Sequence, residues 1–341
     1  MLPRMPGIIE RYRGRLPFAD QDPVVSLAEG STPLVPAPRL SERAGAEVWL
    51  KLEGANPTGS FKDRGMTCAV SAAVREGARA IVCASTGNTA ASAAAYAARA
   101  GLTGAVIVPE GRIATGKLAQ ALVHGARVVT LRGGFDDALR LVRELANRHP
   151  IALVNSVNEY RIEGQKTAAF ELLEALDGEL DTLCIPVGNA GNITAYWRGF
   201  KEAGRHPQLL GFQAAGAAPL VHGAPVEHPQ TVASAIRIGN PARWEDAMDA
   251  MTASGGGVSA VTDEQILEAY RFLASSEGVF CEPASAACVA GLLAHGAPDS
   301  RRIVCVLTGH GLKDPQAAIE HAGAVVPCDP DLQAIEEVVL G

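Results

Sequence analysis

Short apolar segments alternate with longer helical segments along most of this chain of 341 residues. The apolar segments are rich in Val and Ile, which is typical of strands buried on both faces of a sheet. Several of the helical segments end at a glycine, a common helix terminator. Strands that alternate with helices in this way predict βαβ units, and therefore a parallel sheet in an α/β fold.

The alternation assigns most of the chain to regular elements. The predicted strands cover residues 46–52, 79–84, 105–109, 127–131, 151–154, 182–187, 209–214, 258–261 and 303–307. The predicted helices cover residues 60–76, 89–99, 114–124, 135–148, 161–176, 192–202, 263–275 and 284–295. Residues 1–45, 219–253 and 312–341 show no strong periodicity.

The segment that carries the most chemical information follows the first predicted strand. Residues 56–65 read Asn-Pro-Thr-Gly-Ser-Phe-Lys-Asp-Arg-Gly, and the proline and glycine end the strand. Ser60 can cap the next helix, because its hydroxyl can accept an unpaired N–H of the first turn. Lys62 would then lie where the helix dipole disfavours an ammonium ion, and a neutral amine there can form a Schiff base with an aldehyde cofactor. Taken alone, such a lysine is usually a solvated surface group.

Two turns of small residues, each between a predicted strand and a predicted helix, could bind anions. Residues 188–192 read Gly-Asn-Ala-Gly-Asn, and backbone N–H groups at a helix start suit a phosphate. Residues 85–90 read Ser-Thr-Gly-Asn-Thr-Ala, whose hydroxyl and N–H groups suit a carboxylate. The alternatives are a tight turn without a ligand for the first segment and simple helix capping for the second. The first turn matches neither a P-loop nor a dinucleotide fingerprint.

Two further segments place polar groups after predicted strands. Residues 155–161 read Asn-Ser-Val-Asn-Glu-Tyr-Arg, and their arginine could pair a phosphate in a bidentate manner. A capped helix start with an exposed Arg161 is the alternative. Residues 307–314 read Leu-Thr-Gly-His-Gly-Leu-Lys-Asp, where the flanking glycines indicate that His310 belongs to a turn rather than acting as a base.

Together these segments resemble the fold-type II pyridoxal-phosphate enzymes, and most closely the short form of the threonine synthases. The resemblance runs from Gly-Ser-Thr-Pro-Leu at residues 30–34 to Gly-Leu-Lys-Asp at residues 311–314, in the family's order. It implies a tryptophan synthase β-like fold, with two open αβα units, mostly parallel twisted sheets and the cofactor in the interdomain cleft. Residues 1–55 and 150–341 would form the large unit, and residues 56–149 the small one.

The resemblance also implies roles for individual residues. Lys62 would carry the cofactor and move protons, Asn88 would lie beside the ring hydroxyl, and Thr308 would meet the ring nitrogen. The implied cofactor-binding residues are Lys62, Asn88, Gly188, Asn189, Ala190, Gly191, Asn192 and Thr308. The implied substrate-binding residues are Ser85, Thr86, Thr89, Lys117, Asn155, Ser156 and Arg161.

The implied reaction converts O-phospho-L-homoserine and water into L-threonine and phosphate, a β,γ-replacement by a carbon–oxygen lyase. The alternative is a serine/threonine dehydratase or a cysteine-synthase-like β-replacement enzyme. Those enzymes share the lysine segment but do not need the group formed by Asn155, Ser156 and Arg161. A catalytically silent binder of pyridoxal phosphate or an amino acid is less consistent with the sequence, because every catalytic position is filled.

Composition limits the partners and the location. The 30 basic and 37 acidic residues give a net charge of −7 and form no basic stripe, which argues against nucleic-acid binding. No segment reaches the about 18 consecutive apolar residues of a membrane span. The N-terminus lacks a secretion signal, the seven cysteines lack a Cys-x-x-Cys pair, and the eight histidines lack metal-ligand spacing. We therefore expect a cytoplasmic protein without a metal, and the resemblance implies a homodimer.

Overall fold

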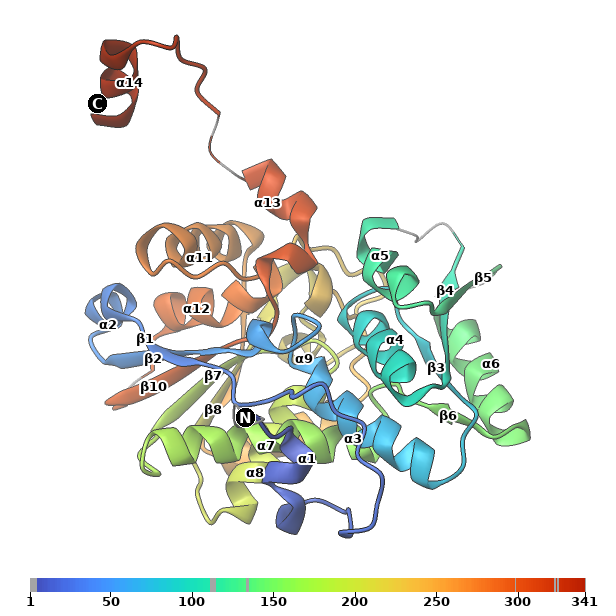
Figure 1. Cartoon of the computed structure of the whole chain (residues 1–341). Helices are drawn as coiled ribbons and strands as arrows, with labels where there is room; N and C mark the ends of the chain where they lie inside the picture. The colour runs from blue at the N-terminus through green and yellow to red at the C-terminus, as the bar shows by residue number, and fades with distance from the viewer. Residues whose placement is uncertain are drawn as a thin grey trace.

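Two sheets organise the fold (Figure 1) in this computed structural model, which describes residues 5–110, 115–132, 135–297, 299–321, 323 and 325–340. The six-stranded sheet has the order β1 (Leu34–Pro36), β2 (Glu47–Leu52), β10 (Arg302–Leu307), β7 (Thr182–Pro186), β8 (Gln208–Ala214) and β9 (Gly257–Val261). The four-stranded sheet has the order β5 (Arg127–Leu131), β4 (Thr103–Pro109), β3 (Ala80–Ala84) and β6 (Ile151–Leu153). Neighbouring strands run parallel except β1 and β2, so the predicted parallel α/β architecture is confirmed.

Helices connect these strands and cover the sheets. They are α1 (Ile8–Arg11), α2 (Pro38–Ala44), α3 (Lys62–Arg75), α4 (Asn88–Ala100), α5 (Thr115–Val123), α6 (Phe135–Arg148), α7 (Glu159–Ala175), α8 (Gly191–Glu202), α9 (Pro219–His222), α10 (Trp244–Ala253), α11 (Asp263–Ser276), α12 (Pro283–His295), α13 (Pro315–His321) and α14 (Leu332–Leu340). All eight predicted helices form, with ends shifted by at most two residues. Figure 1 shows α14 set apart from the rest of the molecule.

The central strand β10 shows why the large sheet is buried on both faces. Ile303, Cys305 and Leu307 belong to a core cluster with residues of α11 and α12. Val304 and Val306 belong to another cluster with residues of α7, α8 and α10. Since successive side chains of a strand point to opposite faces, a continuous apolar run fills both cores.

Some local predictions were wrong. The strand β5 was expected to be buried on both faces, but it is an edge strand without a buried residue. The helix α10 was missed within a segment rich in turns, although Ala247, Ala250 and Met251 bury one of its faces. Phe61 rather than Ser60 occupies the N-cap position of α3; the Ser60 Oγ accepts from the Lys62 N–H at 3.4 Å.

The predicted boundary of the small unit at residue 149 falls short of its sheet. The strand β6 lies beyond that boundary and pairs in parallel with β3, from Ala80 opposite Ile151 to Val82 opposite Leu153. The four-stranded sheet therefore extends to Leu153. The division of the chain into residues 1–55 with 150–341 and residues 56–149 otherwise stays a prediction.

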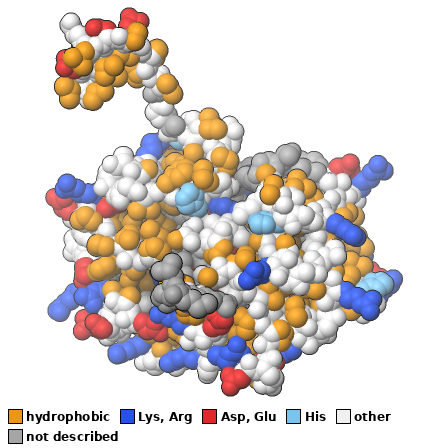
Figure 2. All heavy atoms as spheres, viewed as in Figure 1, with side chains coloured by type: hydrophobic (Ala, Val, Ile, Leu, Met, Phe, Trp, Pro, Cys, Tyr) orange, Lys and Arg blue, Asp and Glu red, His pale blue; other side chains and the backbone are white. Residues whose placement is uncertain are grey.

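The surface visible in Figure 2 has no dominant charge. Lys and Arg side chains are scattered among Asp and Glu side chains over this face. Within the described part of the chain, no helix combines the length and apolar character needed to cross a membrane. The same residues bring no three His, Cys, Asp or Glu side chains close enough together to hold a metal ion.

Candidate active site

A cleft of about 1520 Å³ is lined by segments that follow the carboxyl ends of strands from both sheets. Ser85 follows β3, Asn155 follows β6, Gly188 follows β7 and Thr308 follows β10. In parallel sheets this end of the strands is where ligands usually bind. Every sequence-predicted site residue with a described side chain lines the cleft. Lys117 lies in α5, but its side chain falls outside the described part of the structure.

Lys62 is half-buried at the first position of α3 and faces the cleft. Its Nζ lies 4.1 Å from the centroid of the Phe61 ring. The pKa of Lys62 is lowered to about 7, first by burial and then by the positive charge of Arg161, while Glu282 acts in the opposite direction. Desolvation disfavours the ammonium form, so a large share of Lys62 is a neutral, nucleophilic amine near neutral pH.

The turn after β7 has the geometry of a phosphate cradle. Ala190, in the left-handed conformation with φ of 65°, is the N-cap of α8 and directs the turn into the helix start. A Cβ added to Gly188 would lie 3.1 Å from the Ile236 Cα, so a larger residue there would press on the neighbouring backbone. The Asn192 Nδ2 is buried and has no hydrogen-bond partner among the described residues. A buried donor without an acceptor is unfavourable, so these residues fit an anionic group such as the phosphate of pyridoxal phosphate.

The turn after β3 keeps side-chain donors available. Gly87 is the N-cap of α4, and no side chain caps this helix, so the alternative of simple capping by Ser85, Thr86 or Asn88 was wrong. The Ser85 Oγ accepts a local hydrogen bond from the Gly87 N–H at 3.3 Å. Thr86 and Thr89 line the cleft beside Ser85 and Gly87. These hydroxyls at a helix start could orient a carboxylate.

Arg161 is buried rather than exposed, so the alternative of a solvated arginine was wrong. Its side chain is 2% exposed, and its Nη1 donates to the Val154 carbonyl at 3.2 Å. Its Nε is buried without a partner, and among the described carboxylates none forms an ion pair with it. Burial lowers the pKa of Arg161 to about 10. A buried cation without a counterion lowers the stability of the fold, so the guanidinium group of Arg161 suits an anionic ligand.

Asn155 supports the cleft as well as lining it. Its Oδ1 accepts from the Ala84 N–H at 2.9 Å, and its Nδ2 donates to the Ala84 carbonyl at 3.0 Å. The amide therefore joins the carboxyl ends of β3 and β6 and keeps one N–H for a ligand. Ser156, half-buried, lines the cleft next to it.

Thr308 directly follows β10 and contacts Ser285 in the first turn of α12. Its Oγ1 is 3.0 Å from the Ser285 Oγ, which also accepts from the Gly309 N–H at 2.9 Å. Glu282 is buried in the cleft and accepts a hydrogen bond from Asn88. Neither Glu282 nor Ser285 was predicted to have a catalytic role; their only sequence signal is the segment Glu-Pro-Ala-Ser at residues 282–285.

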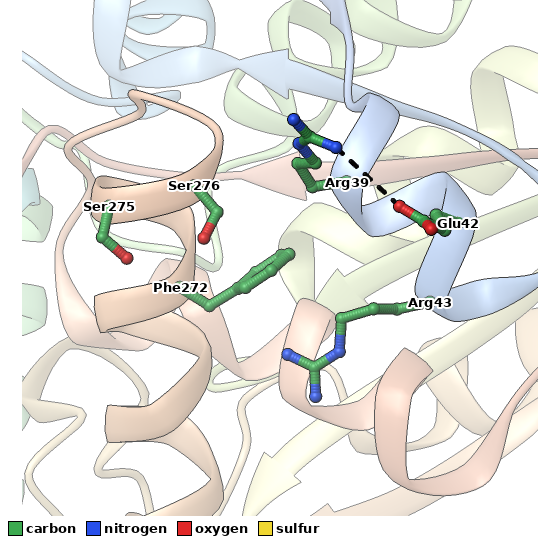
Figure 3. A pocket seen from close by; sticks show the side chains of 6 residues that line it. All are labelled: Arg39, Glu42, Arg43, Phe272, Ser275 and Ser276. Atoms are coloured by element: carbon green, nitrogen blue, oxygen red, sulfur yellow. Dashed lines mark ion pairs between the residues drawn. The ribbon is translucent and has the colours of Figure 1, made fainter.

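A second hollow, of about 460 Å³, lies between α2 and α11 (Figure 3). The Arg43 guanidinium lies 4.8 Å from the Phe272 ring centroid, and Arg39 forms an ion pair with Glu42. None of its lining residues belongs to the sequence-predicted site. The chemistry is therefore concentrated in the cleft.

The sequence profile of the family described as "Pyridoxal-phosphate dependent enzyme" matches residues 25–309. The chain belongs to this family. Among the pyridoxal-phosphate-dependent enzymes, the threonine synthase of Synechocystis sp. is 57% identical, over 98% of this chain and 91% of its own. The threonine synthase of Mycobacterium leprae is 56% identical, over 97% of this chain and 95% of its own. Within the pyridoxal-phosphate-dependent enzymes, the chain thus belongs with the threonine synthases.

Solved structures of other enzymes share the fold at low identity. Cysteine synthase from Entamoeba histolytica superposes with a TM-score of 0.76 at 20% identity, over 92% of this chain and 94% of that one. Maize serine racemase gives a TM-score of 0.74 at 22% identity, over 85% and 93%. These likenesses concern the fold alone. The predicted fold class, the cofactor and membership of a lyase family of amino-acid biosynthesis are confirmed.

Proposed function

We propose that this protein acts as a threonine synthase, which converts O-phospho-L-homoserine and water into L-threonine and phosphate. The observation that carries the proposal is a pair of buried donors in one cleft, the Asn192 Nδ2 and the Arg161 Nε, which have no partner in the described part of the chain. They lie at the starts of different helices, α8 and α7. One donor suits the cofactor phosphate, and the other suits a phosphate belonging to the substrate.

A second phosphate-binding group also separates this reaction from the alternatives. A serine/threonine dehydratase or a cysteine-synthase-like enzyme must bind the cofactor phosphate, but its substrate need not carry another phosphate. A buried arginine without a counterion would destabilise such an enzyme and bring no benefit. For a phosphate ester substrate, the same arginine supplies both affinity and orientation.

When bound, pyridoxal phosphate supplies an electron sink for the substrate carbon atoms. Lys62 would hold it covalently and, with a pKa of about 7, exchange protons at the α and β carbons of the substrate. The neutral hydroxyl of Thr308 would form a hydrogen bond with the ring nitrogen of the cofactor without forcing that nitrogen to be protonated. Ser85, Thr86 and Thr89 would orient the substrate carboxylate.

The substrate phosphate would be held at the other side of the reacting carbon chain. Arg161 and Ser156, together with Lys117, would bind it and stabilise the charge that grows as the bond to the γ carbon breaks. Asn155 would keep the ends of β3 and β6 in place around it. The released phosphate would then serve as a base and accept a proton from the water that adds at the β carbon.

A paired assay tests the function. The purified holoenzyme is given O-phospho-L-homoserine, and released phosphate and L-threonine are measured together; we expect equal amounts. Phosphate without threonine would refute the addition of water. Formation of a keto acid from serine or threonine, without phosphate release from O-phospho-L-homoserine, would establish the dehydratase instead.

We also infer that the protein is a cytoplasmic homodimer, as the family resemblance implies. Light scattering coupled to size-exclusion chromatography tests the assembly, with a mass of twice that of the chain as the expected result. A single-chain mass at working concentrations would contradict it.

A further inference from the structure

Glu282 is a buried carboxyl group in the wall of the cleft. It directly precedes α12 and is 4% exposed. Its backbone N–H donates to the Gly309 carbonyl at 3.0 Å, which ties it to the segment after β10. Its side chain lies so close to Gly309 that an added Cβ there would come within 2.3 Å of the Glu282 Oε1. The position of the carboxyl group is therefore closely defined.

The carboxyl group contacts a residue predicted to lie beside the cofactor ring. The Asn88 Nδ2 donates to the two carboxylate oxygens of Glu282 at 3.0 and 3.3 Å. An ionised carboxylate can only accept hydrogen bonds, so it fixes which end of the Asn88 amide faces it. The Oδ1 of Asn88 is then left for the cleft.

Charged groups surround Glu282 from several elements. Burial raises the pKa of Glu282 to about 7, although the Asn88 hydrogen bond, Lys313 and Lys62 lower it, and Asp314 raises it. The Lys313 Nζ donates to the Thr58 carbonyl at 3.0 Å and to the Gln120 Oε1 at 2.6 Å. Glu282 and Lys62 line the same cleft, and Glu282 raises the pKa of Lys62. The two groups thus influence each other's ionisation.

We propose that Glu282 is a positioning residue of this active site, which orients the Asn88 amide toward the cofactor ring and stabilises the ammonium form of Lys62. The inference rests on the proposed function, because that function brings the cofactor to Lys62 and Asn88. It adds a residue for which the sequence had predicted no catalytic role. Glu282 acts through its two neighbours and forms no bond to the substrate.

The first test needs no cofactor and no turnover. In the cofactor-free protein, the rate at which Lys62 reacts with acetic anhydride is followed against pH by peptide mass spectrometry, and its midpoint reports the Lys62 pKa. Glu282→Gln removes the negative charge with little change in shape, so the midpoint should fall by about 0.5 to 1 pH unit. Glu227→Gln is the matched control, because Glu227 lines the same cleft but is exposed.

The control should leave the Lys62 midpoint at its wild-type value, since solvent screens an exposed charge. An equal midpoint in wild type and Glu282→Gln would overturn the electrostatic part of the inference. Glu282→Asp provides a second variant that keeps the charge. Its midpoint should stay above that of Glu282→Gln, and a midpoint as low as that of Glu282→Gln would also count against the inference.

The second test concerns Asn88. Cofactor affinity is measured by spectrophotometric titration for Glu282→Ala, Asn88→Ala and the double variant. Each single change should weaken binding by about 2- to 12-fold, the range for one hydrogen bond. If Glu282 acts through Asn88, the double variant should bind no more weakly than the worse single variant. Additive losses would refute the orienting role.

These experiments distinguish a failure of this inference from a failure of the proposed function. If Lys62→Ala still bound the cofactor covalently, the assignment of the cofactor lysine would be wrong. The effect of Glu282 on the Lys62 midpoint would remain measurable in that case, because it is recorded without the cofactor.

Discussion

Replacing Glu171 by Gln should strongly destabilise this protein, because Glu171 lies at the centre of a buried charge cluster. Arg64 reaches its two carboxylate oxygens through Nη1 and Nη2, both at 2.7 Å, and the Lys51 Nζ reaches it at 2.8 Å. The Ser31 N–H adds a bond of 2.8 Å. The side chains of Arg64, Lys51 and Glu171 are at most 4% exposed. Glu53 is the other carboxylate that pairs with Arg64.

The expected loss follows from this donor set. Glutamine keeps one oxygen, and its amide N–H₂ group would face donors of Arg64 and Lys51. Removing one partner of a buried ion pair destabilises a protein by about 3 to 5 kcal/mol. Glu174→Gln is the control on the same helix, since Glu174 pairs with Arg11 at the surface, with 49% of its side chain exposed. Such pairs contribute about 0 to 1 kcal/mol.

Urea denaturation of the holoenzyme at a fixed, saturating cofactor concentration measures the free energy of unfolding of both variants. Holding the cofactor constant is necessary, because ligand binding itself stabilises the native state. The two variants should differ by about 2 kcal/mol or more. A Glu171→Gln variant that unfolds within 1 kcal/mol of Glu174→Gln would refute the reasoning, since about 1 kcal/mol is the upper range of a surface pair.

The remaining predictions concern the cofactor, the substrate and pH. Lys62→Ala should abolish turnover and the covalent cofactor adduct seen by mass spectrometry after borohydride reduction. Arg161→Ala should lower kcat/KM for O-phospho-L-homoserine by about 30-fold or more, as expected for the lost partner of a buried charge, whereas Arg198→Ala, at the surface of α8, should stay near wild type. Gly188→Ala should weaken cofactor binding in spectrophotometric titration by about 5- to 150-fold, equal to about 1 to 3 kcal/mol of strain. Because Arg64 holds the pKa of Glu171 well below its usual range, the stability from that pair is present above the ordinary glutamate pKa of about 4.3 and should decline in denaturation curves as the pH falls below it.

The sequence predicted the helices and strands well because period and turn residues are local signals. The apolar runs of β7 and β10 and the turns after them were located within one or two residues, and with them most of the cleft. What the sequence could not predict depends on contacts between distant segments. Asn88 and Glu282 are 194 residues apart, and only the packed fold brings the amide and the carboxylate together.

The burial of individual side chains also could not be predicted from the sequence. An arginine near a helix start has the same sequence signature in water and in a cleft, so the exposed alternative for Arg161 could not be excluded before its 2% exposure was known. The same is true of Asn155, whose amide pairs with the Ala84 backbone across two strands. Both residues were found as candidates, but their physical roles came from the fold.

The helix α7 carries Arg161 in the cleft and Glu171 in the charge cluster, ten residues and about 15 Å apart along one rigid rod. A substitution that shifts or tilts α7 to accommodate a different substrate phosphate also distorts the ion pairs of Glu171 with Arg64 and Lys51. Under the proposed role of Arg161, changes of substrate specificity and of thermal stability are therefore expected to occur together. Laboratory evolution toward a new substrate through this helix should produce variants that inactivate at lower temperature, unless compensating changes arise around Arg64.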